Sequence, residues 1–216
     1  MGSRSDALAR FMASTNIDYE KWHEGIGYDL DALGELRGGE LDEAEQWLFD
    51  RAGNDWRDLE ALLAIGSDRA VAAVLEQLRR GKLEQRLSAA RYLTEDPAVA
   101  ARFPGWVPDR DKAVIDGLRS AVLFEGLTHA FDLAVELRTP AMVRALWQAT
   151  QRDESEASVH AAARLAFLYG KATSDFDWDL RPLFLRFGTP DKAERAAATA
   201  ELGKLCGVDP APFLAG

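Results

Sequence analysis

The stretch 135-VELRTPAMVRALW-147 follows a pattern that the chain uses twice more. The other copies are 63-LAIGSDRAVAAVL-75 and, more loosely, 185-LRFGTPDKAERAA-197. In each copy an apolar residue is followed by Gly or Arg, then by Ser or Thr, then by Pro or Asp, and then by a run rich in Ala and apolar residues. The pattern indicates a point at which one helix ends, the chain turns and the next helix begins.

The polar residue of each copy is placed to cap a helix. Ser67, Thr139 and Thr189 can each accept a hydrogen bond from one of the unpaired backbone N–H groups at a helix N-terminus. Pro140 and Pro190 then occupy the first helical position, where the missing N–H costs nothing and the fixed φ suits a helix. The three copies therefore predict three corners of helical hairpins.

The rest of the chain also predicts helices, because the β-branched residues are scattered and no alternating run is bounded by turns. The segment 18–40 contains several glycines, so its helices are expected to be short and interrupted. A short helix is expected at 6–14. Further expected helices cover 41–51, 55–65, 68–81, 82–93, 110–124, 127–137, 140–151, 155–169, 179–187 and 190–206.

The spacing of the corners predicts how these helices are arranged. Ser67 and Thr139 are 72 residues apart, and Thr139 and Thr189 are 50 residues apart. The first interval suits two α-hairpin repeats of roughly 30–47 residues, and the second suits one repeat with an insertion. Because a single hairpin cannot bury its own apolar face, neighbouring hairpins must stack. We therefore predict an all-α fold, an α-solenoid of degenerate helical hairpin repeats.

Charge is distributed unevenly along the chain. The net charge is −10, and residues 1–66 alone hold 15 Asp and Glu against 6 Lys and Arg. We divide the chain into an acidic N-terminal helical cap, residues 1–54, and a helical repeat body, residues 55–216, that together form one continuous domain. An acidic protein is a poor binder of nucleic-acid phosphates and a suitable binder of a basic protein.

The composition also bears on location. No stretch approaches the roughly 20 apolar residues that are needed to cross a bilayer. The N-terminal segment MGSRSDALARFMASTN has no apolar core of signal-peptide length. We expect a cytoplasmic protein that does not bind a membrane.

The sequence offers little catalytic or metal-binding chemistry. The histidines His23, His129 and His160 do not pair with one another or with the single Cys206 at metal-ligand spacing, and no phosphate-binding glycine motif is present. We therefore expect no metal, no cofactor and no enzymatic activity.

Two groups of carboxylates need separate consideration. Asp55 with Asp58, and Asp175 with Asp177 and Asp179, could perform general acid–base catalysis if they lay within reach of each other. They could equally cap helices, Asp55 before the helix at 56–65 and Asp177 or Asp179 before the one that contains Leu183. We favour capping.

The candidate partner-binding residues combine aromatic rings with the acidic N-terminal charge. Aromatic side chains beside carboxylates suit an interface with an Arg- and Lys-rich surface. The predicted residues are Tyr19, Trp22, Tyr28, Asp42, Glu43, Glu45 and Trp56. Two alternatives stay open: the acidic excess only confers solubility, or the partner binds the concave face of the later repeats.

The other tryptophans divide by context. Trp47 and Trp147 lie on apolar helical stripes and are expected in the core, whereas Trp106 and Trp178 have polar or Gly- and Pro-containing neighbours and are candidates for exposure.

The run 56-WRDLEALLAIGSDRAVAAVLEQLRRGKLEQRLSAARYL-93 resembles HEAT-like repeats, with a second such pairing at 134–147. The flanking phrases 19-YEKWHEGIGYDLDAL-33 and 176-FDWDLRPLFLRFGTPDKAERAAATAELGKLCGVDP-210 are similar to bacterial HEAT-like proteins of polymorphic-toxin loci. The resemblance implies a non-catalytic immunity protein that binds and neutralises a cognate toxin, such as an Rhs or type VI secreted effector. It assigns no binding residue by position.

Two other functions also fit a HEAT-like chain. One is a DNA glycosylase for alkylated bases, which uses a carboxylate and aromatic residues in a basic groove. The other is a relative of phycobilin lyases, which the repeats resemble locally. This chain has carboxylates and tryptophans but lacks a basic surplus, and nothing in it marks a pigment site.

Overall fold

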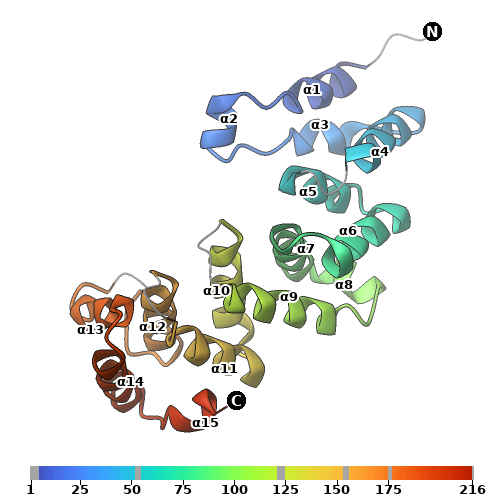
Figure 1. Ribbon diagram of the computed structural model, residues 1–216. Coiled ribbons are helices and arrows are strands. Elements are labelled where there is room, and N and C mark those ends of the chain that lie inside the picture. The colour runs from blue at the N-terminus through green and yellow to red at the C-terminus, as the bar shows by residue number, and fades with distance from the viewer. Residues whose placement is uncertain (1–4, 52–54, 121–124, 153–155, 175–176, 216) are drawn as a thin grey trace. The chain divides into compact units, whose positions relative to one another are not determined.

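The computed structural model describes residues 5–51, 55–120, 125–152, 156–174 and 177–215, and every regular element in these residues is a helix (Figure 1). The all-α prediction is confirmed. The chain divides into two compact units, one ending at Asp109 and the other beginning at Arg110. The predicted cap, residues 1–54, and the first predicted repeats lie within the same unit.

The first unit is a succession of helices in which each packs on helices near it in sequence. Its elements are α1 (Asp6–Ser14), α2 (Tyr19–His23), α3 (Leu30–Glu35), α4 (Gly39–Arg51), α5 (Trp56–Ile65), α6 (Asp68–Arg80), α7 (Leu83–Glu95) and α8 (Pro97–Arg102). Helix α1 packs on α3, α3 and α4 pack on α5, and α5, α6 and α7 pack on one another. Leu8, Phe11, Leu48, Leu59 and Leu62 are fully buried between them.

The second unit follows the same principle. Helix α9 (Val107–Arg119) lies mostly in this unit, and the remaining elements are α10 (Glu125–Leu137), α11 (Pro140–Ala149), α12 (Glu156–Leu168), α13 (Arg181–Leu185), the 3-10 helix η1 (Arg186–Gly188), α14 (Lys192–Cys206) and α15 (Ala211–Leu214). Helix α12 packs on α10, α11, α13, η1 and α14. Trp147 is fully buried as expected, and its ring stacks on Phe213 of α15, a short helix that the sequence did not reveal.

Two of the three predicted corners are confirmed in detail. The Ser67 hydroxyl accepts a hydrogen bond from Ala70 N, and the Thr139 hydroxyl accepts one from Met142 N, with Pro140 at the first helical position. The residue before each cap has a left-handed backbone, at φ +65° for Gly66 and +51° for Arg138. The two corners therefore share one backbone conformation although only one has the glycine that favours it.

The third predicted corner is displaced. Asp191, not Thr189, caps α14, and its carboxylate accepts hydrogen bonds from Ala193 N and Glu194 N. Thr189 instead follows η1, and its hydroxyl accepts a hydrogen bond from Asp191 N. The prediction that Thr189 caps the helix and that Pro190 begins it is wrong, because a carboxylate two residues later satisfies two N–H groups rather than one.

Smaller differences concern the segment after α8 and the tryptophans. Helix α9 begins at Val107 and includes Pro108, since proline is tolerated in a first turn. Trp106 is buried, contrary to expectation, and Trp47 is only half buried, whereas Trp178 is exposed as expected. None of the helices that the structure describes combines the length and the apolar character needed to cross a membrane.

Candidate surface for a protein partner

Among the described residues of the first unit, the most exposed large apolar side chains lie on and just after α2. Tyr19 is 76% exposed, Trp22 61% and Ile26 47%, and we call these three residues the α2 patch. Helix α2 has five residues and none of them is buried. Large aromatic side chains that lie together in solvent are unusual on a soluble protein and commonly mark a binding surface.

The α2 patch is locally ordered. The Asp18 carboxylate caps the helix by accepting from Lys21 N, and Lys21 Nζ donates to Asn16 O. The ring centroids of Tyr19 and Trp22 are 6.0 Å apart at 37°. Paired rings held this way lose little conformational entropy when a partner covers them.

Arg57, at the start of α5, fixes the chain that follows α2. Its side chain is only 1% exposed, and Nε donates to the Ile26 carbonyl over 2.7 Å. Its guanidinium pairs with the Asp55 carboxylate at 2.9 Å and lies over the Trp56 ring, 4.5 Å from the centroid. Asp55 also caps α5 as expected, by accepting from Arg57 N. The α2 patch is thus tied to the first turn of α5.

Trp56 continues the aromatic surface toward α7. Its ring is half exposed and stacks on Tyr92, with centroids 6.4 Å apart at 27°. Gly27 lies against both Trp56 and Glu60, since a Cβ built on it would be 3.9 Å from the Trp56 ring and 3.1 Å from Glu60 Oε2. The loop after α2 therefore lies close to Glu60 as well as to Trp56.

A small open cavity of about 220 Å³ lies beside this stack. Its lining includes the carboxylates of Glu60, Glu95 and Asp96, the Tyr92 ring, and apolar Leu30 and Leu63. We call it the acid-lined cavity.

The carboxylates of this cavity differ in their surroundings. Glu95 pairs with Arg91 at 2.8 Å. Among the described residues, no hydrogen-bond or ion-pair partner of Glu60 is found. Burial and the nearby Glu95 carboxylate raise the pKa of Glu60, and burial together with Glu60 raises the pKa of Tyr92. A cation placed in the cavity would lower the pKa of both Glu60 and Tyr92, because it favours their charged forms.

Tyr28 requires a correction. It was predicted to anchor a partner, but it is 6% exposed, and its hydroxyl donates to Asp58 Oδ1 over 2.9 Å. Its ring meets Phe11 and Trp47 edge to face. Tyr28 lies in the core because its hydroxyl has a buried acceptor, so we remove it from the binding surface.

Asp58 is itself fully buried, and the nearby Asp55 carboxylate pairs with Arg57. Arg51 Nε lies 3.7 Å from Asp58 Oδ1, and Asp58 Oδ2 has no hydrogen-bond partner among the described residues. Burial raises the pKa of Asp58 above the ordinary carboxyl range.

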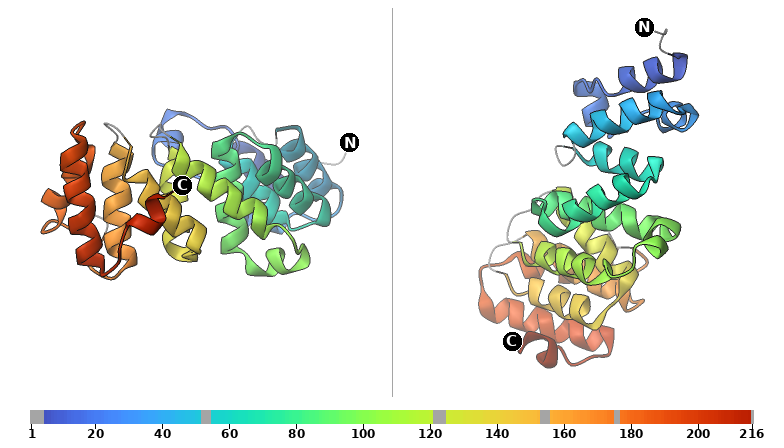
Figure 2. Two further views of the ribbon diagram at one scale, coloured as in Figure 1. Left: turned by 60° about the horizontal axis from the view of Figure 1, so that its bottom comes forward. Right: turned by 90° about the vertical axis from the view of Figure 1, so that its right-hand side faces the viewer.

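The predicted acidic residues of α4 lie apart from the α2 patch. Asp42 and Glu43 are exposed, whereas Glu45 is half buried and accepts a hydrogen bond from the Ser67 hydroxyl. Helices α2 and α4 flank α3 in the sequence, and α2 and α4 lie at opposite ends of the pair formed by α1 and α3 (Figures 1 and 2). The structure therefore brings Tyr19 and Trp22 together with the loop that reaches Trp56, and leaves the acidic residues of α4 elsewhere.

Four residues of this surface were missed by sequence reasoning: Ile26, Glu60, Tyr92 and Glu95. Ile26 stands between two glycines, which gave no helical face to assign it to. Glu60 lies on α5, and Tyr92 and Glu95 lie on α7, and the exposed sides of these helices depend on how the two pack. A single sequence contains no direct signal for that packing.

Within the described part of the chain, no group of three or more His, Cys, Asp or Glu side chains is arranged to hold a metal ion. His23 lies 3.1 Å from the Glu24 carboxylate on the exposed side of α2, and Cys206 is buried. Comparison of the chain with protein-family models, with curated proteins and with solved structures found no match.

Proposed function

We propose that the chain is a non-catalytic binding protein that captures a basic surface of a protein partner with the α2 patch and the acid-lined cavity. In this proposal the two units form an α-solenoid of degenerate HEAT-like hairpins. The partner is a secreted bacterial toxin, and the chain is the cytoplasmic immunity protein that neutralises it. The observation that carries the proposal is the exposure of Tyr19 and Trp22 on a helix that buries none of its residues.

The aromatic side chains supply the expected affinity. Trp and Tyr are the residues most enriched among those that dominate binding energy at interfaces. Trp22 and Tyr19 are ordered by their mutual contact and by the capped helix beneath them. A partner that covers them gains apolar burial without reorganising the chain.

The acidic residues supply the expected specificity. Glu20 and Glu24 are exposed on and beside α2, and the Glu60 carboxylate has no partner among the described residues. An Arg or Lys side chain from the partner that enters the acid-lined cavity pairs with Glu60 and places its apolar stem along Leu30 and Leu63. Complementary charge of this kind also accelerates association.

A DNA glycosylase is the second candidate, and one observation favours it: the Trp56–Tyr92 stack lies beside the Glu60 carboxylate. Such enzymes flip a base into a pocket with aromatic and carboxylate groups. The acidic lining of this cavity opposes the approach of phosphates, however, since nucleic-acid affinity rests on neutralising them. Duplex binding by the purified chain at physiological salt would support the glycosylase and contradict the immunity proposal.

The test is a binding measurement between the chain and the product of the gene adjacent to its own. We expect a stable complex in which Trp22→Ala raises the dissociation rate about tenfold or more. Trp178→Ala is the matched control, because Trp178 is also largely exposed, at 74% against 61% for Trp22, but belongs to the second unit. Failure of the neighbouring product to bind would remove the immunity assignment.

A second variant separates the two parts of the surface. Glu60→Gln keeps the shape of the side chain and breaks no hydrogen bond or ion pair among the described residues. We expect it to weaken binding several-fold at low salt, with a smaller difference at high salt because ions screen the interaction. If both Trp22→Ala and Glu60→Gln bind as the unmodified chain does, the partner binds another surface.

A further inference from the structure

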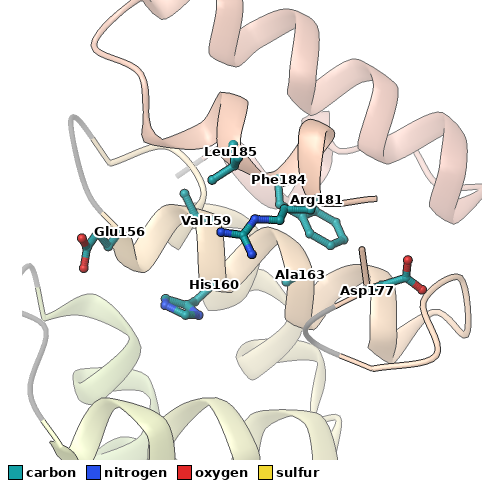
Figure 3. Close-up of a pocket in the computed structure, with 8 residues that line it drawn as sticks. All are labelled: Glu156, Val159, His160, Ala163, Asp177, Arg181, Phe184 and Leu185. Carbon is teal, nitrogen blue, oxygen red and sulfur yellow. The ribbon is translucent and has the colours of Figure 1, made fainter. Parts of the chain in front are cut away.

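The second unit contains a larger groove that the proposed function does not use. It lies between α12 and α13 and has a volume of about 360 Å³ (Figure 3). Val159 and Ala163 of α12, together with Phe184 and Leu185 of α13, form its apolar walls. Leu185 is 54% exposed, so part of this apolar surface faces solvent. The volume is that of a site for a small organic molecule.

One cation is directed into the groove. In Figure 3 the Arg181 guanidinium lies above His160 and between the two apolar walls. Arg181 rests on the Trp178 ring, 4.7 Å from the centroid, and no carboxylate pairs with it among the described residues. The guanidinium thus presents its N–H groups, the donor set best suited to a carboxylate, without an internal acceptor.

His160 adds a second donor on the opposite side of the groove. Its side chain is exposed and makes a ring contact with Phe131, at 6.4 Å between centroids. Neither ring nitrogen forms a hydrogen bond with the described residues. A neutral imidazole carries one N–H, so His160 can donate to an anion without first being protonated.

Two carboxylates also line the groove, those of Asp177 and Glu156, but they do not lie between Arg181 and His160. The Asp177 carboxylate accepts from the backbone N–H groups of Thr173, Asp179 and Leu180, and these bonds lower its pKa. In Figure 3 it lies at one end of the groove and points away from Arg181, and the Glu156 carboxylate points outward at the other end. The centre of the groove therefore combines apolar walls with two donors for which the described residues provide no acceptor.

We propose that this groove binds a small apolar carboxylate, with the carboxylate between Arg181 and His160 and the apolar group against Phe184 and Leu185. The charge of Arg181 selects the anion, and the apolar walls select against small hydrophilic acids. The site lies wholly within the second unit and is independent of the proposed interface in the first.

The experiment titrates the full chain with 3-phenylpropanoate and, separately, with its uncharged amide. Calorimetry measures affinity, and the amide-proton NMR spectrum locates the site through the Trp178 indole signal, which Trp178→Phe assigns. We expect saturable binding of the acid and at least about tenfold weaker binding of the amide, because a hydrogen bond to a charged group is lost. Butyrate is expected to bind more weakly than 3-phenylpropanoate because it covers less of the apolar wall.

Arg181→Gln is the decisive variant, since Arg181 is exposed and its replacement removes no ion pair among the described residues. We expect this variant to bind 3-phenylpropanoate about tenfold or more weakly and to bind the amide with unchanged affinity. Arg144→Gln is the control, because Arg144 is exposed on α11 of the same unit and does not line the groove. Equal binding of acid and amide, unchanged binding by Arg181→Gln, or no binding of either compound at millimolar concentration would overturn the proposal.

Discussion

Replacing Tyr28 by Phe tests whether this residue is a core residue or a partner anchor. The change removes one hydroxyl and keeps the ring, so the edge-to-face contacts with Phe11 and Trp47 are retained. What is lost is the 2.9 Å hydrogen bond to Asp58, a fully buried carboxylate. Asp58 then keeps Arg51, whose Nε lies 3.7 Å from Asp58 Oδ1, as its ion-pair partner among the described residues.

The size of the effect follows from this environment. A hydrogen bond to a charged group contributes about 1.5–3 kcal/mol, and a buried acceptor that loses its donor is left without compensation. We therefore expect Tyr28→Phe to lower the free energy of unfolding of the first unit by about 2–3 kcal/mol. The loss should shrink at acid pH, because the Tyr28 hydroxyl stabilises the ionised form of Asp58, whose pKa burial raises.

Hydrogen exchange measured on peptides from α5 reports the opening of the first unit, which avoids treating two units as one transition. Urea unfolding at pH 7 and at pH 4 provides the second measurement. A loss within about 0.5 kcal/mol, typical of a neutral surface substitution, would refute the role given to this bond. Unchanged stability together with lost partner binding would restore Tyr28 as a partner contact.

Three further predictions concern other parts of the chain. Thr139→Ala removes the bond from Met142 N and is expected to cost about 1 kcal/mol in urea unfolding, whereas an unchanged midpoint would contradict the cap. Asp58→Asn should make the free energy of unfolding of the first unit depend less on pH between pH 4 and 7. Because the pKa of Asp58 is raised in the folded state, the unmodified first unit loses stability as the pH rises through that pKa. Burial raises the pKa of Cys206 to about 11, so the native thiol should react with a disulfide reagent at pH 8 far more slowly than the unfolded chain; equal rates would contradict its burial.

The fold class could be predicted because its signals are local. Ser67 and Thr139 cap the expected helices, and such caps depend only on residues within one turn. Thr189 shows the limit of this reasoning. Thr189 and Asp191 are both good capping residues two positions apart, and Pro190 favoured the first. The 3-10 turn at Arg186–Gly188, which settles the choice, depends on packing against α12 and α14.

The candidate surface could be predicted only in part, for the same reason. Tyr19 and Trp22 lie in a short, glycine-flanked segment with no apolar stripe, so their exposure follows from the sequence. Tyr28 comes from the same kind of segment, and its burial is decided by Asp58, thirty residues further along the chain. Local composition cannot distinguish these outcomes, since they depend on which distant side chain offers a hydrogen-bond acceptor.

The location of both candidate sites has a common physical origin. Helices α2 and α13 have five residues each, too few to present a full apolar face to a neighbour. The longer helices bury their apolar faces against one another, so exposed apolar side chains gather around the short ones. Of the large apolar side chains exposed among the described residues, five lie on or close to α2 or α13: Tyr19, Trp22, Ile26, Trp178 and Leu185.

This distribution separates the residues that maintain the fold from those available for binding. Substitutions on the buried faces of α5, α6 or α12 remove packing and should destabilise the units. Substitutions of the exposed side chains around α2 and α13 remove few internal contacts, so they should leave stability nearly unchanged while altering what each surface binds. The interruptions in the hairpin pattern are therefore where this chain can acquire a binding specificity without a cost to its core.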